Sequence, residues 1–146
     1  EALELIVNAI EKSKLTPGKD VVICLDVAAN ELINKKGQYS IQSSNFSTVD
    51  DVVGYYKKLT SSYPIKSIED PFAEEDWSAW QKITSELGSK VQIVGDDLFV
   101  TNEKRLSRFK YCYAKKYTQT NICCWCWPYW GSSFNGRNFN CYLCIF

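Results

Sequence analysis

The 146-residue sequence contains no methionine and no histidine. A chain without an initiator methionine has been either processed or recorded incompletely. Its first residues include Glu1, Glu4 and Glu11, where a signal peptide would need a basic region and an apolar run. We therefore expect an incomplete sequence rather than a processed one. There is also no run of 18 apolar residues, so the sequence predicts no membrane-spanning helix.

Acidic and basic residues are unevenly distributed, although the formal net charge is zero. Residues 1–106 contain 12 Lys/Arg and all 17 Asp/Glu, whereas residues 107–146 contain 5 Lys/Arg and no acid. Six of the seven cysteines also lie in the second segment. Such a change in composition indicates two segments of different origin or different physical character, and it predicts a boundary near residue 106.

Short apolar runs alternate with helical patterns in the first segment. Apolar residues at helical spacing predict helices, Thr48 and Asp51 form a capping pair, and short β-branched runs predict buried strands. The predicted helices cover residues 2–14, 49–62 and 76–87, with another beginning near Asn102; the strands cover 21–25, 65–68 and 91–95, with a loop or small hairpin over 34–47. This alternation favours right-handed βαβ units on a parallel sheet.

Each predicted strand ends in an acid, at Asp26, Glu69 and Asp96. The carboxyl ends of parallel strands lie on one side of the sheet, where α/β barrels carry out their chemistry. Three converging carboxylates need a cation to remain ionised together, and ligands made only of oxygen favour magnesium over zinc. Alternatively, each acid caps a helix or faces water. The spacing leaves both interpretations open.

Four stretches of the first segment resemble the signatures of bacterial-type enolases (phosphopyruvate hydratases), in that family's order and spacing. They are LDVAA at 25–29, SIEDPF at 67–72, DWSAWQ at 76–81 and VGDDLFVTN at 94–102. The resemblance covers residues 1–106 and implies an α/β fold, a partial (β/α) TIM-type barrel of the enolase C-terminal domain. Residues 107–146 are then expected to be an irregular tail rich in cysteine and aromatic residues.

The resemblance also implies a function. Enolases are carbon–oxygen lyases that reversibly dehydrate 2-phosphoglycerate to phosphoenolpyruvate with Mg²⁺. Asp26, Glu69 and Asp96 match the family's magnesium ligands, and Glu69 and Asp96 would also contact the substrate. The family is homodimeric and cytoplasmic, and is also found secreted or at the cell surface.

Residues next to these acids are expected to have supporting roles. We expect Asp70 and Asp97 to orient a ligand or cap a helix. Pro71–Phe72 is expected to fix the loop after its strand. Trp77, Trp80 and Cys24 are expected to pack in the interior.

The sequence departs from the family after Asn102. A strand ending in the family's lysine base should follow, but residues 121–124 read Asn-Ile-Cys-Cys. The barrel strands bearing the general-acid glutamate, the N-terminal domain and the Ser-His-Arg-Ser substrate grip are also missing. No catalytic residue is therefore assigned, and we expect a truncated, inactive fragment whose tail is read out of frame.

An alternative is a non-enzymatic binding protein with a zinc site in the tail. Its four ligands would be Cys123, Cys126, Cys141 and Cys144, at a spacing close to that of a zinc ribbon. The basic and aromatic residues of the tail form no recognisable nucleic-acid-binding module. The tryptophan-rich run at 125–130 is short and broken by Pro128, which argues against insertion into a membrane interface.

Overall fold

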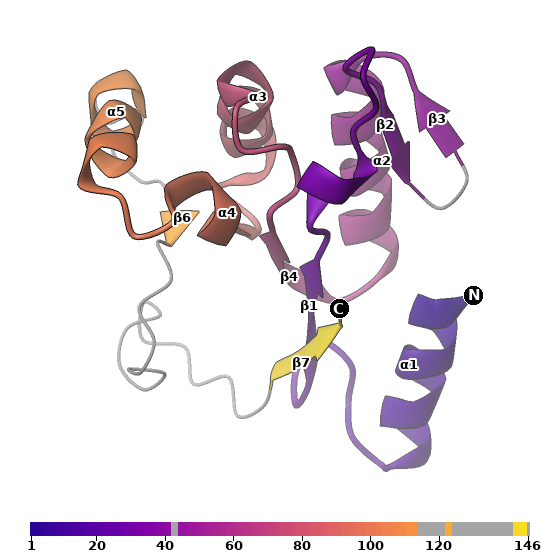
Figure 1. Ribbon diagram of the computed structural model, residues 1–146. Coiled ribbons are helices and arrows are strands. Elements are labelled where there is room, and N and C mark those ends of the chain that lie inside the picture. Colours follow the sequence, from indigo (N-terminus) through magenta and orange to yellow (C-terminus); the bar gives the residue numbers. More distant parts are fainter. Residues whose placement is uncertain (42–43, 114–121, 124–141, 146) are drawn as a thin grey trace.

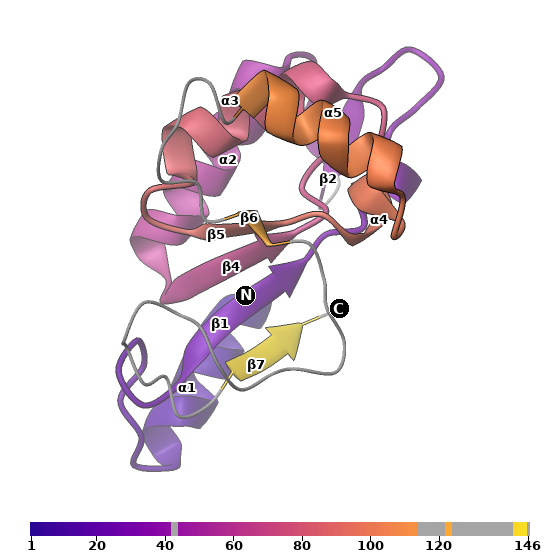
Figure 2. The same ribbon diagram turned by 90° about the vertical axis from the view of Figure 1, so that its left-hand side faces the viewer.

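The computed structural model describes residues 1–41, 44–113, 122–123 and 142–145 (Figure 1). Within these residues the main sheet has five strands in the order β6-β5-β4-β1-β7, and every pairing in it is parallel. The strands are β1 (Val22–Asp26), β4 (Ile65–Glu69), β5 (Gln92–Val94), β6 (Ile122–Cys123) and β7 (Tyr142–Ile145). Strands β1, β4, β5 and β6 lie side by side in the sheet in the same order as they occur in the chain, as in a section of an α/β barrel (Figure 2).

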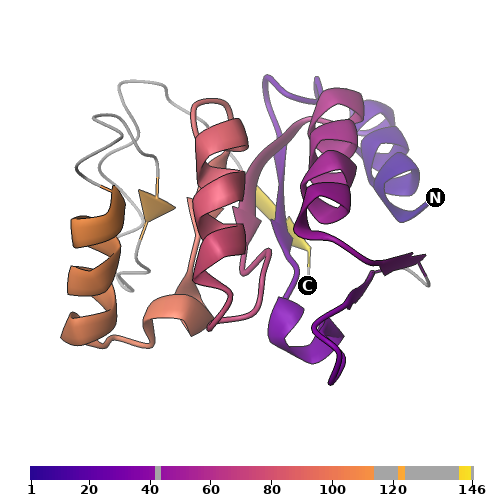
Figure 3. The same cartoon turned by 90° about the horizontal axis from the view of Figure 1, so that it is seen from above.

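Helices connect these strands and lie side by side along the sheet (Figure 3). The longer helices are α1 (Ala2–Lys12), α2 (Val49–Ser62), α3 (Trp77–Leu87) and α5 (Glu103–Tyr113), and the short ones are η1 (Ala29–Leu32) and α4 (Asp96–Phe99). A separate hairpin pairs β2 (Tyr39–Ile41) with β3 (Ser44–Phe46). In the described part of the chain, no helix is both long enough and apolar enough to span a membrane.

The hydrophobic core fills the space between the sheet and these helices. Ile23, Ile68 and Ile93 come from three adjacent strands and are fully buried in it, together with Trp80 of α3. Side chains alternate between the two faces of a strand, so residues next to these isoleucines project from the opposite face. The helices therefore cover one face of the sheet, and the other face is the one that lines the interior of a barrel.

Local sequence signals set the ends of the helices. The Thr48 hydroxyl accepts a hydrogen bond from the Asp51 backbone N–H, and the Asp51 carboxylate accepts one from the Thr48 backbone N–H, which completes the predicted capping box of α2. The Asp76 carboxylate accepts from the Ala79 N–H at the start of α3. Gly88 ends α3 where an added Cβ would lie 2.5 Å from the Thr84 carbonyl oxygen, a contact too close for any other residue.

The predicted partial barrel is confirmed, with differences in detail. Helix α4 was not predicted, because its single turn is too short to show helical periodicity in the sequence. Helix α5 continues to Tyr113, so the boundary expected at residue 106 falls inside a helix. Two short strands of the second segment, β6 and β7, join opposite edges of the sheet. The unrelated origin of residues 107–146 stays a prediction.

Candidate metal centre

The ends of β1, β4 and β5 bring the predicted acidic residues to one edge of the sheet. Asp26 and Glu69 are direct partners in the register of β1 and β4, and Glu69 is the partner of Val94 on β5. Asp96 follows two residues after Val94, at the start of α4. The adjacent register pair, Leu25 and Ile68, faces the helices, so Asp26 and Glu69 point to the opposite face. Asp26 and Glu69 therefore lie at the carboxyl end of that face, and Asp96 follows the end of the neighbouring β5 with its side chain exposed.

Burial and neighbouring negative charges raise the pKa values of Glu69 and Asp26 at this edge. Burial, followed by the negative charges of Asp26, Asp70, Asp96 and Asp97, raises the pKa of Glu69 to about 7. Burial also raises the pKa of Asp26, with smaller contributions from the charges of Asp97 and Asp96. Burial and the like charges around them make the ionised forms of these two carboxyl groups less favourable.

Asp70 is the most buried acid of this group, with 4% of its surface exposed. Burial is the main cause that raises its pKa to about 6. Its Oδ2 accepts a hydrogen bond of 3.1 Å from the backbone N–H of Asp97, which lies in the first turn of α4. Its Oδ1 is buried and has no hydrogen-bond partner among the described residues. Asp70 thus caps α4 from a different loop, in agreement with the predicted supporting role.

Two residues close to the predicted ligands have left-handed backbone conformations. Asp70 directly follows Glu69 and has φ 41°, and Ala28 lies two residues after Asp26 and has φ 46°. Positive φ is uncommon outside glycine and is costly for alanine. Backbone hydrogen bonds hold both turns, since Ala29 N donates to Asp70 O and Asp70 N donates to Val94 O. The turns after β1 and β4 are therefore fixed by contacts with neighbouring strands.

Aromatic residues hold the loop that follows Glu69. The Tyr39 hydroxyl donates to Asp76 Oδ2 at 3.0 Å and accepts from the Ala73 N–H at 3.1 Å. The Trp80 indole N–H donates to the Ala73 carbonyl at 3.1 Å. Phe72 is buried and makes an edge-to-face contact with Tyr39. The predicted roles of Phe72 and Trp80 in packing agree with these contacts, and Cys24 is buried as expected.

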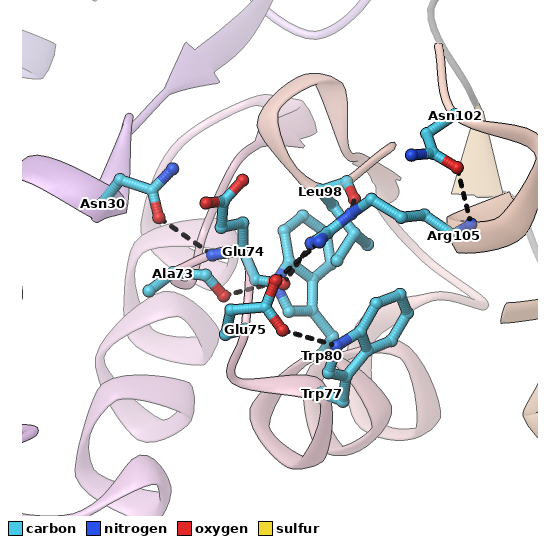
Figure 4. Close-up of polar contacts among 9 residues, drawn as sticks. All are labelled: Asn30, Ala73, Glu74, Glu75, Trp77, Trp80, Leu98, Asn102 and Arg105. Atoms are coloured by element: carbon cyan, nitrogen blue, oxygen red, sulfur yellow. Dashed lines mark hydrogen bonds and ion pairs between the residues drawn. The ribbon is translucent and has the colours of Figure 1, made fainter. Parts of the chain in front are cut away.

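Arg105 joins the loops after β4 and β5, a role that sequence reasoning missed. Its guanidinium donates to the carbonyls of Leu98 and Glu74 and pairs with the Glu75 carboxylate (Figure 4). It also lies over the Trp77 ring, 5.4 Å from the ring centroid. Trp77 is therefore a platform for a cation as well as a packing residue. The only sequence signal for this role was an arginine near the start of a predicted helix. Such arginines are too common to indicate a particular contact.

The donor chemistry fits a hard divalent cation, but the side chains are not already gathered around one point. In the described residues, no group of three or more Asp, Glu, Cys or His side chains is arranged to hold an ion. The charges of Asp96 and Asp97 nevertheless contribute to the raised pKa values of both Asp26 and Glu69, so these acids are electrostatic neighbours. Such effects act over several ångströms, whereas direct coordination needs contacts of about 2.0–2.6 Å. Binding of one ion by three ligands would therefore require the carboxylates to rotate toward one another.

Parallel βα units with acids at the carboxyl ends of successive strands define an α/β-barrel protein with an oxygen-rich site. Comparison with protein families agrees, because residues 1–117 match the model of the enolase C-terminal TIM barrel domain. The chain is 57% identical over 108 residues to the enolase of Pelagibacter ubique and 50% identical over 107 residues to that of Tropheryma whipplei (strain Twist). These matches cover 74% and 73% of this chain. The chain belongs to the enolase family, and spans about a quarter (25%) of the length of these relatives.

The family model matches residues 1–117, whereas the two relatives match over 108 and 107 residues, and the boundary expected near residue 106 stays a prediction. The proposed zinc ligands Cys126 and Cys141 lie outside the described residues. The backbones of Cys123 and Cys144 are in β6 and β7, at opposite edges of the five-stranded sheet. Four strand spacings of about 4.8 Å separate these edges, which argues against a shared zinc ion.

Proposed function

We propose that this chain is the magnesium-binding section of an enolase barrel. Asp26, Glu69 and Asp96 would hold one Mg²⁺, and Glu69 and Asp96 would also contact 2-phosphoglycerate. The observation that carries the proposal is the register pairing of Asp26 with Glu69, with Asp96 two residues beyond the next strand. Family membership supports the assignment. A homodimeric, cytoplasmic state of the complete protein is proposed on the same ground.

The electrostatics of the edge support a cation rather than a purely structural role. Helix caps and surface acids do not need to lie beside one another, and such a cluster lowers the stability of the folded chain when its members are ionised. Here burial, together with the charges of neighbouring acids, raises the pKa of Glu69 to about 7 and that of Asp70 to about 6, so full ionisation of the group is unfavourable. A bound divalent cation would stabilise the ionised forms of these carboxylates. It would also supply the positive charge that offsets the carboxylate of the substrate.

We propose that the chain alone does not dehydrate 2-phosphoglycerate. Removal of a proton next to a carboxylate needs a base within hydrogen-bond reach, in addition to the cation. The oxygens of Asp26, Glu69 and Asp96 would be committed to the ion. At the distance where the family's lysine base is expected, residues 121–124 read Asn-Ile-Cys-Cys. The expected role of this section is therefore to bind the cation and to hold it in place.

Titration of the full chain with Mn²⁺ tests metal binding, because Mn²⁺ accepts the same oxygen ligands and its free form can be measured by electron paramagnetic resonance. We expect one site in the wild type and at least about tenfold weaker binding in Asp96→Asn. Glu31→Gln is the matched control, since it removes one exposed acid outside the centre. Equal affinity of Asp96→Asn and the wild type would reject the proposed site.

Assays of phosphoenolpyruvate formation test the second part of the proposal. We expect no turnover by the wild type with Mg²⁺ present. Turnover that disappears in Asp96→Asn would show that the chain contains a base that we have not assigned. Tightly bound zinc at one ion per chain would instead favour the cysteine site of the tail.

A further inference from the structure

Asn30 connects the three segments that follow β1, β4 and β5. It lies in η1, directly after β1. Its Nδ2 donates to Asp97 Oδ2 at 2.9 Å, and its Oδ1 accepts from the backbone N–H of Glu74 at 2.9 Å. Glu74 belongs to the loop after β4, and Asp97 lies in α4, after β5. Figure 4 shows the contact of Asn30 with the Glu74 backbone.

These bonds reach the direct neighbours of the proposed ligands. Asp97 follows Asp96 in the chain, and its backbone N–H donates to Asp70, the residue after Glu69. Asn30 itself is four residues from Asp26, and the backbone N–H of Ala29 donates to the Asp70 carbonyl at 3.1 Å. Asp97 is thus held from two sides, through its side chain by Asn30 and through its backbone by Asp70.

We propose that Asn30 is a positioning residue of the metal centre, because its two hydrogen bonds set the spacing of the loops that carry Asp26, Glu69 and Asp96. This inference rests on the proposed function. Outer residues that hydrogen-bond to ligand-bearing segments commonly change metal affinity without touching the metal. Asn30 is half-buried, so exchange of its bonds for bonds to water is restricted.

An amide suits this position because it offers one donor and one acceptor. The donor meets a carboxylate, and the acceptor meets a backbone N–H. Alanine would remove both bonds without changing the charge. The reciprocal double variant Asn30→Asp/Asp97→Asn would restore both: the new carboxylate at position 30 accepts from the Glu74 N–H and from the new amide at position 97. This exchange leaves the total charge of the centre unchanged.

The experiment measures Mn²⁺ affinity of the full chain by electron paramagnetic resonance, at a temperature where thermal melting shows every variant folded. We expect Asn30→Ala to bind Mn²⁺ about tenfold more weakly than the wild type, and the reciprocal double variant to recover affinity to within about threefold. Asn34→Ala is the matched control. Asn34 also makes side-chain hydrogen bonds, but these close the local turn to Lys36 and Gln38. We expect it to lower the melting temperature without changing affinity.

Two results would overturn the inference. One is an Asn30→Ala variant that melts earlier but binds Mn²⁺ as tightly as the wild type, which would give Asn30 a structural role only. The other is a loss of affinity in Asn30→Ala that the reciprocal variant does not recover. Either result, with binding still lost in Asp96→Asn, leaves the proposed metal site intact. Binding that does not depend on Asp96 at all would instead reject both the site and the inference.

Discussion

Asp26 and Glu69 lie directly opposite each other on neighbouring parallel strands, at the carboxyl ends of β1 and β4. The charge of Asp26 is the largest electrostatic cause, after burial, of the raised pKa of Glu69. Like charges placed side by side destabilise the ionised state unless a cation lies between them. This pairing therefore links the stability of the metal-free chain to pH and to divalent cations.

The stability of the metal-free chain should fall as the pH rises. In the folded chain Glu69 has a pKa of about 7 and Asp70 a pKa of about 6, above their ordinary values of 4.5 and 3.8. Between these values, the folded state holds protons that the unfolded state has released. The resulting contribution to the free energy of unfolding is fully present below about pH 4 and is lost as the pH rises to about 7. We expect thermal melting in EDTA to occur at a higher temperature at about pH 5 than at about pH 8.

The double variant Glu69→Gln/Asp70→Asn is the control for this pH dependence. It replaces both groups with amides that do not titrate, so the melting temperature should change less over the same pH interval. A wild-type protein that becomes more stable toward high pH would show that these two acids do not dominate the linkage.

Asp70→Asn alone should stabilise the metal-free chain at alkaline pH. The amide oxygen can still accept from the Asp97 N–H, and removal of the buried negative charge should outweigh the cost of an amide NH2 at the site of Oδ1, which has no partner among the described residues. The gain should shrink toward about pH 5, where wild-type Asp70 is largely protonated. Paired melting curves at the two pH values measure this difference. Glu31→Gln, at an exposed position, should show no such dependence. A lower melting temperature for Asp70→Asn at high pH would contradict the assigned cost of the charge.

Tyr39→Phe should destabilise the chain by about 1–3 kcal/mol. The hydroxyl bonds to Asp76 and to the backbone of Ala73, and Tyr39 is 2% exposed, so its loss leaves the Ala73 N–H buried without that acceptor. Chemical denaturation gives the free energy of unfolding. Tyr63→Phe removes the hydroxyl of a half-buried tyrosine and should cost less. Equal effects of the two substitutions would mean that the Tyr39 hydroxyl has no special role.

Arg105→Lys should destabilise the chain by about 1–3 kcal/mol, because lysine cannot reproduce the planar fork of donors. The guanidinium contacts the Leu98 and Glu74 carbonyls at the same time and also lies over Trp77. Arg108→Lys is the matched substitution at an exposed arginine that lies over the same ring, 4.4 Å from its centroid. Urea denaturation of both variants should give the larger loss for Arg105→Lys, and the reverse order would contradict this account of the loop contacts.

Most of the fold could be predicted from local sequence signals. The helix over 49–62 was predicted with its capping pair, and the strands ending at Asp26 and Glu69 were predicted from short β-branched runs. These features are encoded within a few residues of one another. Helix α4 was missed because it has a single turn, too short for a periodic pattern, and because the Asp70 carboxylate that caps it lies 27 residues before the N–H that it binds. No local pattern carries such a contact.

The same limit applies to the candidate site. The three acids could be selected because each ends a predicted strand, and their assignment as magnesium ligands stays a prediction. Asn30 and Arg105 could not be selected, because their partners are distant in the sequence. The partners of Asn30 are 44 and 67 residues away, and Arg105 contacts Glu74 and Glu75 about 30 residues away. Only the folded arrangement brings these partners together.

Paramagnetic broadening of backbone amide signals by Mn²⁺ tests the central claim most directly. A single ion held by Asp26, Glu69 and Asp96 should selectively broaden the amides of residues 26–28, 69–71 and 95–98 at substoichiometric Mn²⁺. The signals of α1 and of the exposed acids on α2 should remain sharp, and excess Mg²⁺ should reverse the broadening. Broadening spread over these exposed acids, or absent from one of the three loops, would contradict a metal centre built from the ends of β1, β4 and β5.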